Sequence, residues 1–393
     1  MSFLRMMASL RLTVALLALS MFLVLAGTLA QTSEGVWSVV DRYFRSPMVV
    51  VPLQLFVPEK VLRVPLAIPF PGGLTLGVLL FVNLIGAHAT RFKFQARRIG
   101  IIMTHVGVIM LLVGEFVTGV AAEEGNMTSD EGGRANYVED IRETELAVID
   151  RSKPESDLVV AVPQRLLAAS AAGSRPITHG LLPFEIRVDE WLGNSRVLGP
   201  MQAKPAERAG VRADAGAGRS ITAVAAPTAT GVDGQSMDLP SAYVTLLRGG
   251  KSLGTYLVSA WLDGQSVGVE GRTYEISLRF KRTYKPYVLE LIDFRHDKFV
   301  GTDKPRNFSS RVRLIDPGRN VDREVVISMN NPLRHAGETF YQSAFKPGDT
   351  GTILQVVKNP GWLIPYISCG MVTLGLLVHF GIRMGSSVRR LAS

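Results

Sequence analysis

Three of the six histidines lie within long apolar runs, where an ionisable side chain is costly and usually serves a function. His88, His105 and His379 each stand a few residues from a group of Arg and Lys, and His105 is the deepest, roughly 10 Å inside its run at 1.5 Å per helical residue. Neutral imidazole is a common metal ligand and an axial ligand of haem iron. These three residues are therefore candidates for a haem-iron site near one side of a membrane.

Structural roles for the same residues stay open. A histidine within one turn of a helix end, as His88 and His379 are, can lie at the level of the lipid headgroups as an ordinary polar residue. His105 has apolar residues three, four and seven positions further along its face, which also fits plain packing between helices. Asn83, another polar residue within a run, is expected to hydrogen-bond to a neighbouring helix.

Four apolar runs are long enough to cross a bilayer, which takes about 20 residues of helix. The first is too long for the apolar core of a signal peptide, so we interpret it as an uncleaved anchor. The runs occupy residues 12–30, 74–90, 99–122 and 361–382.

Cations gather in the short flanks of these runs with no acidic residue among them. They are Arg5, Arg11, Arg91, Lys93, Arg97, Arg98, Arg383, Arg389 and Arg390. This is the positive-inside pattern, which places both termini in the cytoplasm. The net charge of +9 therefore reflects membrane orientation, and it does not indicate a nucleic-acid-binding surface.

The runs divide the chain into three parts. Residues 1–120 form an N-terminal membrane region with an outer loop at 31–73, residues 121–360 form a domain, and residues 361–393 hold the last span and a cytoplasmic tail. From residue 243 onward, strand-like segments alternate with turns every 8–12 residues, which favours a β-sandwich or an open barrel. The predicted fold is thus four transmembrane α-helices with a large extracytoplasmic, mainly β domain between the third and fourth. Within it, residues 199–240 are rich in Ala, Gly and Pro and predict a flexible insertion.

Cysteine content and the absence of enzyme motifs exclude several functions. The single cysteine, Cys369, excludes an internal disulfide, a CxxC redox pair and a CxxCH haem-attachment motif. No nucleotide-binding glycine motif, HExxH or GxSxG occurs, so no self-contained active site is visible.

The aromatic and basic stretch 281–314 is a second candidate region, in which Arg295, His296 and Phe299 could bind a partner. Two strands and their connecting loop would explain the same stretch without any function.

Four segments, in this order along the chain, resemble the ResB family (also called CcsB) of system II cytochrome c biogenesis. The resemblance covers most of the chain apart from the insertion. The segments are LRLTVALLALSMFLVLAGTLAQ (10–31), NLIGAHATRFKFQARRIGIIMTHVGVIMLLVG (83–114), LELIDFRHDKFVGTDKPRNFSSRVRL (289–314) and NPLRHAGETFYQSAFKPGDTGTILQVVKNPGW (331–362).

The resemblance implies a membrane subunit that works with a ResC/CcsA-like partner. Together they would deliver haem b across the membrane for covalent attachment to apocytochrome c, which makes this chain at most the accessory subunit of a haem lyase. The family's haem-site histidine corresponds to His105 in MTHVGVIMLLVG, with His88 and His379 as weaker candidates and a second ligand from the partner. A thioredoxin-like thiol reductase is a further expected partner. The expected location is a bacterial plasma membrane or a thylakoid membrane.

One alternative from a different functional class remains. The chain could be a non-catalytic membrane scaffold or receptor, with an extracytoplasmic domain that binds a protein and histidines that only pack between helices. Haem bound through His105 separates the two hypotheses.

Overall fold

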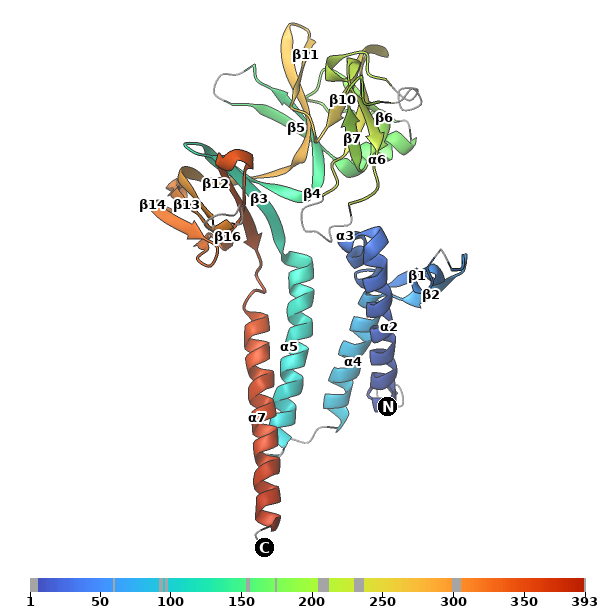
Figure 1. The fold of residues 1–393 in the computed structure, drawn as a ribbon, viewed down its shortest axis with the longest axis vertical. Helices are drawn as coiled ribbons and strands as arrows, with labels where there is room; N and C mark the ends of the chain where they lie inside the picture. Colours follow the sequence, from blue (N-terminus) through green and yellow to red (C-terminus); the bar gives the residue numbers. More distant parts are fainter. Residues whose placement is uncertain are drawn as a thin grey trace.

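The computed structural model describes residues 6–58, 61–91, 95, 98–152, 156–173, 175–203, 212–229, 237–298 and 305–391. Long helices form one half of the molecule and strands form the other (Figure 1). The first long helix begins, and the last one ends, at the end of the helical half away from the strands (Figure 1). Which side of a membrane each end faces stays a prediction.

Four helices within the described residues are long and apolar enough to cross a membrane. Each overlaps one of the predicted runs, and the first and last extend beyond them into polar residues. Four membrane helices and a large, mainly β domain confirm the predicted fold class, while the predicted domain limits stay predictions. The helices are α2 (Leu10–Glu34), α4 (Gly73–Arg91), α5 (Ile99–Ala121) and α7 (Ile364–Leu391).

Helix α2 packs against α4 around a buried amide. Asn83 is 1% exposed, and its Oδ1 accepts a hydrogen bond of 2.6 Å from Thr13 Oγ1 on α2. Its Nδ2 donates to the backbone oxygen of Ser9, at 3.2 Å. An unpaired amide would be costly in apolar surroundings, so these bonds fix how α4 sits on α2. The predicted interhelical role of Asn83 is confirmed.

Helix α5 packs against α7 through glycines spaced seven residues apart. Gly100, Gly107 and Gly114 are its buried residues. A Cβ at Gly100 would lie 2.5 Å from the backbone nitrogen of His379, and one at Gly107 would lie 2.9 Å from the backbone oxygen of Ser368. The two backbones approach so closely that only glycine fits between them, which is how small residues stabilise helix pairs in lipid.

The segment between the first two spans, expected to be a loop, contains short helices and a β-hairpin. Strands β1 and β2 pair antiparallel, with Val51 opposite Ile68. Val49 and Val51 face inward and join Leu23 of α2 in one apolar cluster, which holds the hairpin against the helix. The elements are α3 (Val36–Val39), the π-helix η1 (Val40–Phe44), β1 (Met48–Pro52), the 3-10 helix η2 (Leu53–Phe56) and β2 (Ala67–Pro71).

We use the name β-domain for residues 123–358. Strand β3 (Glu123–Asp130) directly follows α5, and strand β17 (Gly351–Lys358) precedes α7. The two strands pair antiparallel, with Glu123 opposite Lys358. The β-domain therefore begins and ends at one place, above the α5–α7 pair (Figure 1).

The largest sheet has ten strands and curls into a nearly closed, barrel-like shape. Its strand order is β14-β13-β12-β4-β3-β17-β16-β15, with β5 added to β4 and β11 added to β12. The interior is filled by buried residues such as Tyr287, Leu314 and Phe340. The remaining strands are β4 (Arg134–Asp150), β5 (Leu158–Pro163), β11 (Gln265–Val269), β12 (Arg272–Lys298), β13 (Pro305–Asp316), β14 (Val321–Ser328), β15 (Leu333–His335) and β16 (Glu338–Phe345).

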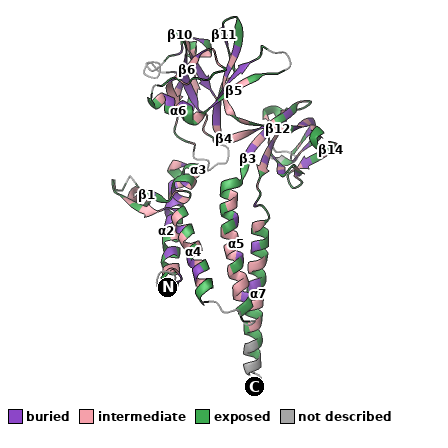
Figure 2. Ribbon diagram, turned by 180° about the vertical axis from the view of Figure 1, so that it is seen from behind, coloured by how far each residue is buried: buried purple, intermediate pink, exposed green. Residues whose placement is uncertain are grey.

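A second core lies further from the helices, where the long strands β4 and β12 extend past the barrel (Figure 2). There they face a three-stranded sheet in the order β10-β9-β6 and the helix α6. The predicted hairpin turn at Arg248-Gly249-Gly250 is confirmed: Gly249 and Gly250 have φ of 55° and 77°, as a tight turn between β9 and β10 requires. The elements are α6 (Gln164–Gly173), β6 (Glu185–Leu192), β9 (Ser241–Arg248) and β10 (Lys251–Ser259).

The predicted insertion at 199–240 contains a strand and a 3-10 helix. Strand β8 (Thr222–Ala225) pairs with β7 (Ser195–Leu198), and the backbone nitrogen of Ala223 donates to the hydroxyl of Tyr243 at 3.0 Å. The 3-10 helix η4 spans Gly216–Arg219. Residues 204–211 and 230–236 of the insertion lie outside the described residues.

Candidate functional site: two histidines on neighbouring membrane helices

His88 of α4 and His105 of α5 meet edge to face. Their ring centroids are 4.7 Å apart, and their ring planes cross at 85°. Both side chains are partly buried. The contact lies where α4 and α5 come together, at the end of the helices away from the β-domain (Figure 1).

The glycine face of α5 determines the direction of His105. His105 is two positions before Gly107, which is about 200° around a helix of 3.6 residues per turn. Because Gly107 contacts α7, His105 lies on the opposite side of α5 and faces α4. One helix thus uses one face for close packing and the other for its histidine.

The backbone of α4 fixes the tautomer of His88. Its Nδ1 lies 2.8 Å from the backbone oxygen of Leu84, one turn earlier. A carbonyl oxygen can only accept, so Nδ1 carries the proton and Nε2 carries the lone pair when the ring is neutral. A backbone carbonyl on the second ring nitrogen is also how many metal-ligating histidines are held.

His379 is not part of this pair. Its backbone packs on Gly100, on the α7 side of α5, and its ring lies 5.5 Å from that of Phe380. The structure therefore brings together two of the three histidines predicted for a haem site and places the third on the far side of α5. Among the described residues, no group of three or more His, Cys, Asp or Glu side chains could hold a metal ion.

The ring geometry limits how haem would fit. Two histidines that bind one haem iron on opposite faces are separated by the porphyrin plane and two iron–nitrogen bonds. Rings in edge-to-face contact at 4.7 Å leave no room for that plane. In this arrangement the pair provides at most one axial ligand, and the other face of the iron is left for a group outside this chain.

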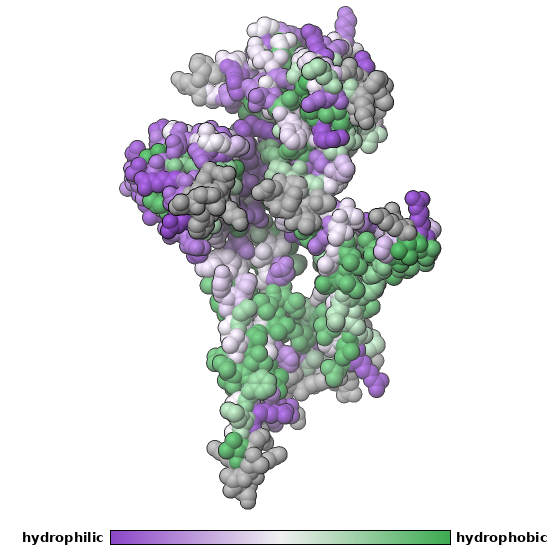
Figure 3. All heavy atoms as spheres, in the orientation of Figure 1, coloured by the Kyte–Doolittle hydropathy of each residue, from purple (hydrophilic) through white to green (hydrophobic). Residues whose placement is uncertain are grey.

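An opening separates the α2–α4 pair from the α5–α7 pair. The pairs meet near His88 and His105 and diverge toward the β-domain in both ribbon views (Figures 1 and 2). The space-filling view shows the opening as a gap between apolar surfaces just below the β-domain (Figure 3).

The second predicted region lies on the barrel. Arg295 is well exposed and pairs with Asp293 at 2.9 Å. The side chain of His296 is 4% exposed, its Nδ1 lies 2.8 Å from Asp349 Oδ1, and its ring packs on Phe345. Arg295 is thus accessible to a partner, whereas His296 is enclosed. Phe299 lies outside the described residues.

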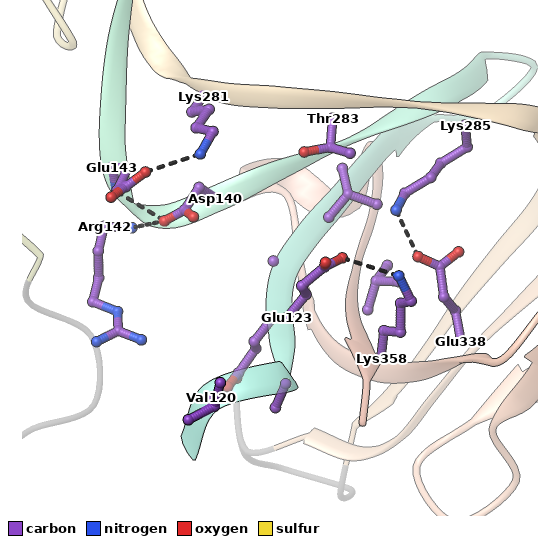
Figure 4. A pocket seen from close by; sticks show the side chains of 15 residues that line it. Val120, Glu123, Asp140, Arg142, Glu143, Lys281, Thr283, Lys285, Glu338 and Lys358 are labelled. Atoms are coloured by element: carbon purple, nitrogen blue, oxygen red, sulfur yellow. Dashed lines mark hydrogen bonds and ion pairs between the residues drawn. The ribbon is translucent and has the colours of Figure 1, made fainter. Parts of the chain in front are cut away.

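The sequence reasoning missed a charged pocket of about 580 Å³ where the β-domain joins the membrane helices (Figure 4). It opens beside Val120 at the end of α5, and charged residues of both signs line it. Lys281 pairs with Glu143 at 3.0 Å and Lys285 with Glu338 at 2.5 Å. The charged lining residues are Glu123, Glu124, Asp140, Arg142, Glu143, Lys281, Lys285, Glu338 and Lys358.

Pairing within the pocket stabilises the charged forms. The hydrogen bond from Lys281 lowers the pKa of Glu143 below its ordinary value, although burial acts in the opposite direction. The same bond raises the pKa of Lys281. Such a lining can exchange these ion pairs for contacts with a ligand that carries both signs of charge, such as a peptide segment. The available sequence signal was the basic start of the stretch 281–314, because Lys281 and Lys285 lie in it.

Comparisons with known proteins found one family match and one similar protein. Residues 244–353 match the ResB-like family. The chain is also 26% identical over 309 residues to Protein NrfI of Wolinella succinogenes, an alignment that covers 77% of this chain. The chain spans only 29% of the length of that relative. Through residues 244–353, which make up most of the barrel, the chain matches the ResB-like family, and the resemblance predicted from its sequence is confirmed.

Proposed function

We propose that this chain acts in cytochrome c biogenesis as a membrane subunit that handles haem as its substrate. The family match supports the process, and the contact between His88 and His105 supports the haem site. In this proposal His105 coordinates the haem iron, and His88, whose tautomer is fixed by Leu84, orients it. The single observation that carries the proposal is that two intramembrane imidazoles, from different helices, meet at one point.

The second axial ligand comes from a ResC/CcsA-like partner. The edge-to-face rings support a single ligand from this chain, so the other face of the iron is left to a residue of the partner. Haem would then be held between the two proteins, near the end of the helices away from the β-domain, before delivery to the other side.

The charged pocket is the place we assign to apocytochrome c. It lies at the junction of the β-domain with the membrane helices, and its ion pairs suit a peptide segment that carries both signs of charge (Figure 4). Contact there would present the substrate next to the membrane.

Absorption spectroscopy of the full chain, purified with and without a co-expressed ResC/CcsA-like partner, tests the haem site. The variants are His105→Ala, His88→Ala and His379→Ala. We expect a Soret band in the wild-type complex, its loss in His105→Ala, a shifted or weaker band in His88→Ala, and no change in His379→Ala. Imidazole added to the medium should restore the band of His105→Ala, because it can fill the space left by the side chain.

Two outcomes would count against the proposal. Equal haem content in His105→Ala and His379→Ala would remove the ligand role of His105. A wild-type complex that assembles without haem would favour the scaffold hypothesis, in which the β-domain binds a protein and the histidines only pack.

A further inference from the structure

The β1–β2 hairpin projects sideways from the helical half of the molecule. It lies beside the end of α2 nearest the β-domain, at about the level where α5 ends, and it points away from the other helices (Figure 1). The fold of the β-domain does not need it, and the proposed haem site does not use it.

The surface of the hairpin is unusually apolar for a segment that connects two membrane helices. Met48 and Val50 alternate with the inward-facing valines of β1 and are 63% and 51% exposed. Between the strands, Val61, Leu62 and Leu66 are 76%, 59% and 58% exposed. Exposed apolar side chains gathered in this way usually mark an interaction surface.

This surface continues directly from the lipid-facing side of α2. Phe22 of α2 stacks on Phe56 of the hairpin, with ring centroids 5.6 Å apart, and lies 4.9 Å from Phe70. One residue before Phe22, Met21 is 75% exposed on the helix. The space-filling view shows hydrophobic surface both on these helices and on the hairpin that projects from them (Figure 3).

We propose that the exposed face of the hairpin 48–71 is immersed in lipid, in the interfacial region of the leaflet nearest the β-domain. Its buried face is held by α2, so its other face lies at the depth where the membrane helices end. The sequence between residues 46 and 72 holds three charged residues, Glu59, Lys60 and Arg63, all of which fall between the two strands along the chain. Segments that lie in the membrane interface likewise combine an apolar face, buried at the boundary between headgroups and acyl chains, with charged residues beside it.

Lipid fits this surface better than a second protein. A docking site for a partner normally carries polar groups around an apolar centre, to specify the contact. Among the described residues, the exposed side chains of β1 and β2 are Met48, Val50, Ala67 and Pro69, none of which is polar. Acyl chains and the inner edge of the headgroup layer require no such specificity.

Single-cysteine labelling tests the depth of the hairpin, because the chain has only Cys369 to remove. In a Cys369→Ser background, Val50→Cys and Leu66→Cys are labelled with the fluorophore NBD, and the full chain is placed in nanodiscs of phosphatidylethanolamine and phosphatidylglycerol. We expect blue-shifted emission at both sites, strong quenching by lipids with a nitroxide on the acyl chain, and little quenching by iodide.

Two further labelled positions serve as references for the measurement. Met21→Cys, exposed within the membrane span, gives the lipid-immersed reference, and Ser252→Cys, exposed on the β-domain, gives the aqueous one. Labels at residues 50 and 66 that behave like residue 252 would overturn the proposal. It would also fail if these labels were quenched by iodide in the chain alone and protected only in the complex with a partner, since a protein would then cover the hairpin. All four positions are exposed, so the substitutions leave the packed interior unchanged.

Discussion

The guanidinium carbon of Arg142 lies 4.2 Å from the ring centroid of Trp37. Trp37 belongs to α3, just after the first membrane span, and Arg142 belongs to β4. The contact therefore joins the α2–α4 half of the helical region to the β-domain, whose first strand follows α5 and whose last strand precedes α7. Arg142 also lines the charged pocket, so the same side chain connects this joint to the proposed peptide site.

Replacing Arg142 with Ala should loosen α3 without unfolding the β-domain. A cation–π contact at an exposed site contributes about 0.5–1 kcal/mol, which corresponds to a loss of roughly two- to fivefold in hydrogen-exchange protection. The amides of residues 36–44 should exchange faster in Arg142→Ala and in Trp37→Leu, measured by mass spectrometry in nanodiscs. The control is Arg295→Ala, which removes an exposed arginine elsewhere on the same domain. Unchanged exchange in both variants would mean that the contact contributes nothing.

The glycine face of α5 should tolerate no added methyl group. A Cβ at Gly100 would lie 2.5 Å from His379 N and 2.6 Å from Gly375 O, both backbone atoms that cannot move aside alone. Gly100→Ala should therefore cost about 1–3 kcal/mol by overpacking. The matched control on the same helix is Gly119→Ala. A Cβ added there meets no neighbouring atom within 4 Å, and helix propensity favours Ala over Gly. Thermal unfolding in detergent should show a lower midpoint for the first variant and an equal or higher one for the second.

Inside the barrel, the hydroxyl of Tyr287 donates to the carboxylate of Glu338, which also pairs with Lys285. Burial and the nearby carboxylate both raise the pKa of Tyr287, so its phenol stays protonated and remains a donor. Tyr287→Phe should destabilise the β-domain by about 1–3 kcal/mol, because a buried carboxylate loses one of its donors. Urea unfolding measures the change. Tyr341→Phe, at a more exposed position, should change the free energy of unfolding by less than about 0.5 kcal/mol.

Acid should weaken the barrel through Asp316. Burial raises the pKa of this carboxyl group, but hydrogen bonds from His335 Nε2 (2.8 Å) and Arg319 Nη1 (3.0 Å) outweigh burial and lower the pKa below its ordinary value of 3.8. The unfolded chain then takes up a proton at a higher pH than the folded one. The stability from Asp316 is therefore complete above the ordinary pKa and is lost as the pH falls through the folded-state value.

The measurement is the unfolding midpoint of the full chain between pH 6 and pH 3. The midpoint of the wild type should fall at the acid end of this range. The midpoint of Asp316→Asn should be lower at pH 6 but should change less as the pH falls. Parallel curves for the two proteins would show that other carboxyl groups account for the acid sensitivity.

The spans were predictable because each depends on local composition alone. A run of about 20 apolar residues is a helix in lipid whatever surrounds it, since its backbone groups must be satisfied within the segment. Asn83 was predictable for the same reason, because a buried amide needs a partner. The β1–β2 hairpin was missed because Pro52, Pro58, Pro65 and Pro69 hide the strand pattern, and burial against α2 is what makes this segment fold.

The meeting of His88 and His105 could not be predicted from the sequence. Their separation of 17 residues spans a helix end, a link and a helix start, and the direction of each ring depends on how α5 rotates against α7. The glycine spacing on α5 shows which face packs closely against another helix, but it indicates the direction of His105 only once that helix is known to be α7. The charged pocket could not be predicted either, because its lining residues come from segments far apart in the sequence. These segments are α5, β3, β4, β12, β16 and β17.

Glu123 and Lys358 face each other across the first and last strands of the β-domain. The chain enters the β-domain through β3 and, some 240 residues later, leaves it through the neighbouring strand β17. Because the two ends of the β-domain lie side by side, an insertion in its far part, such as the segment around residues 199–240, does not have to change the distance between α5 and α7. The far part of the β-domain can therefore change in length without a change in the way α5 packs on α7.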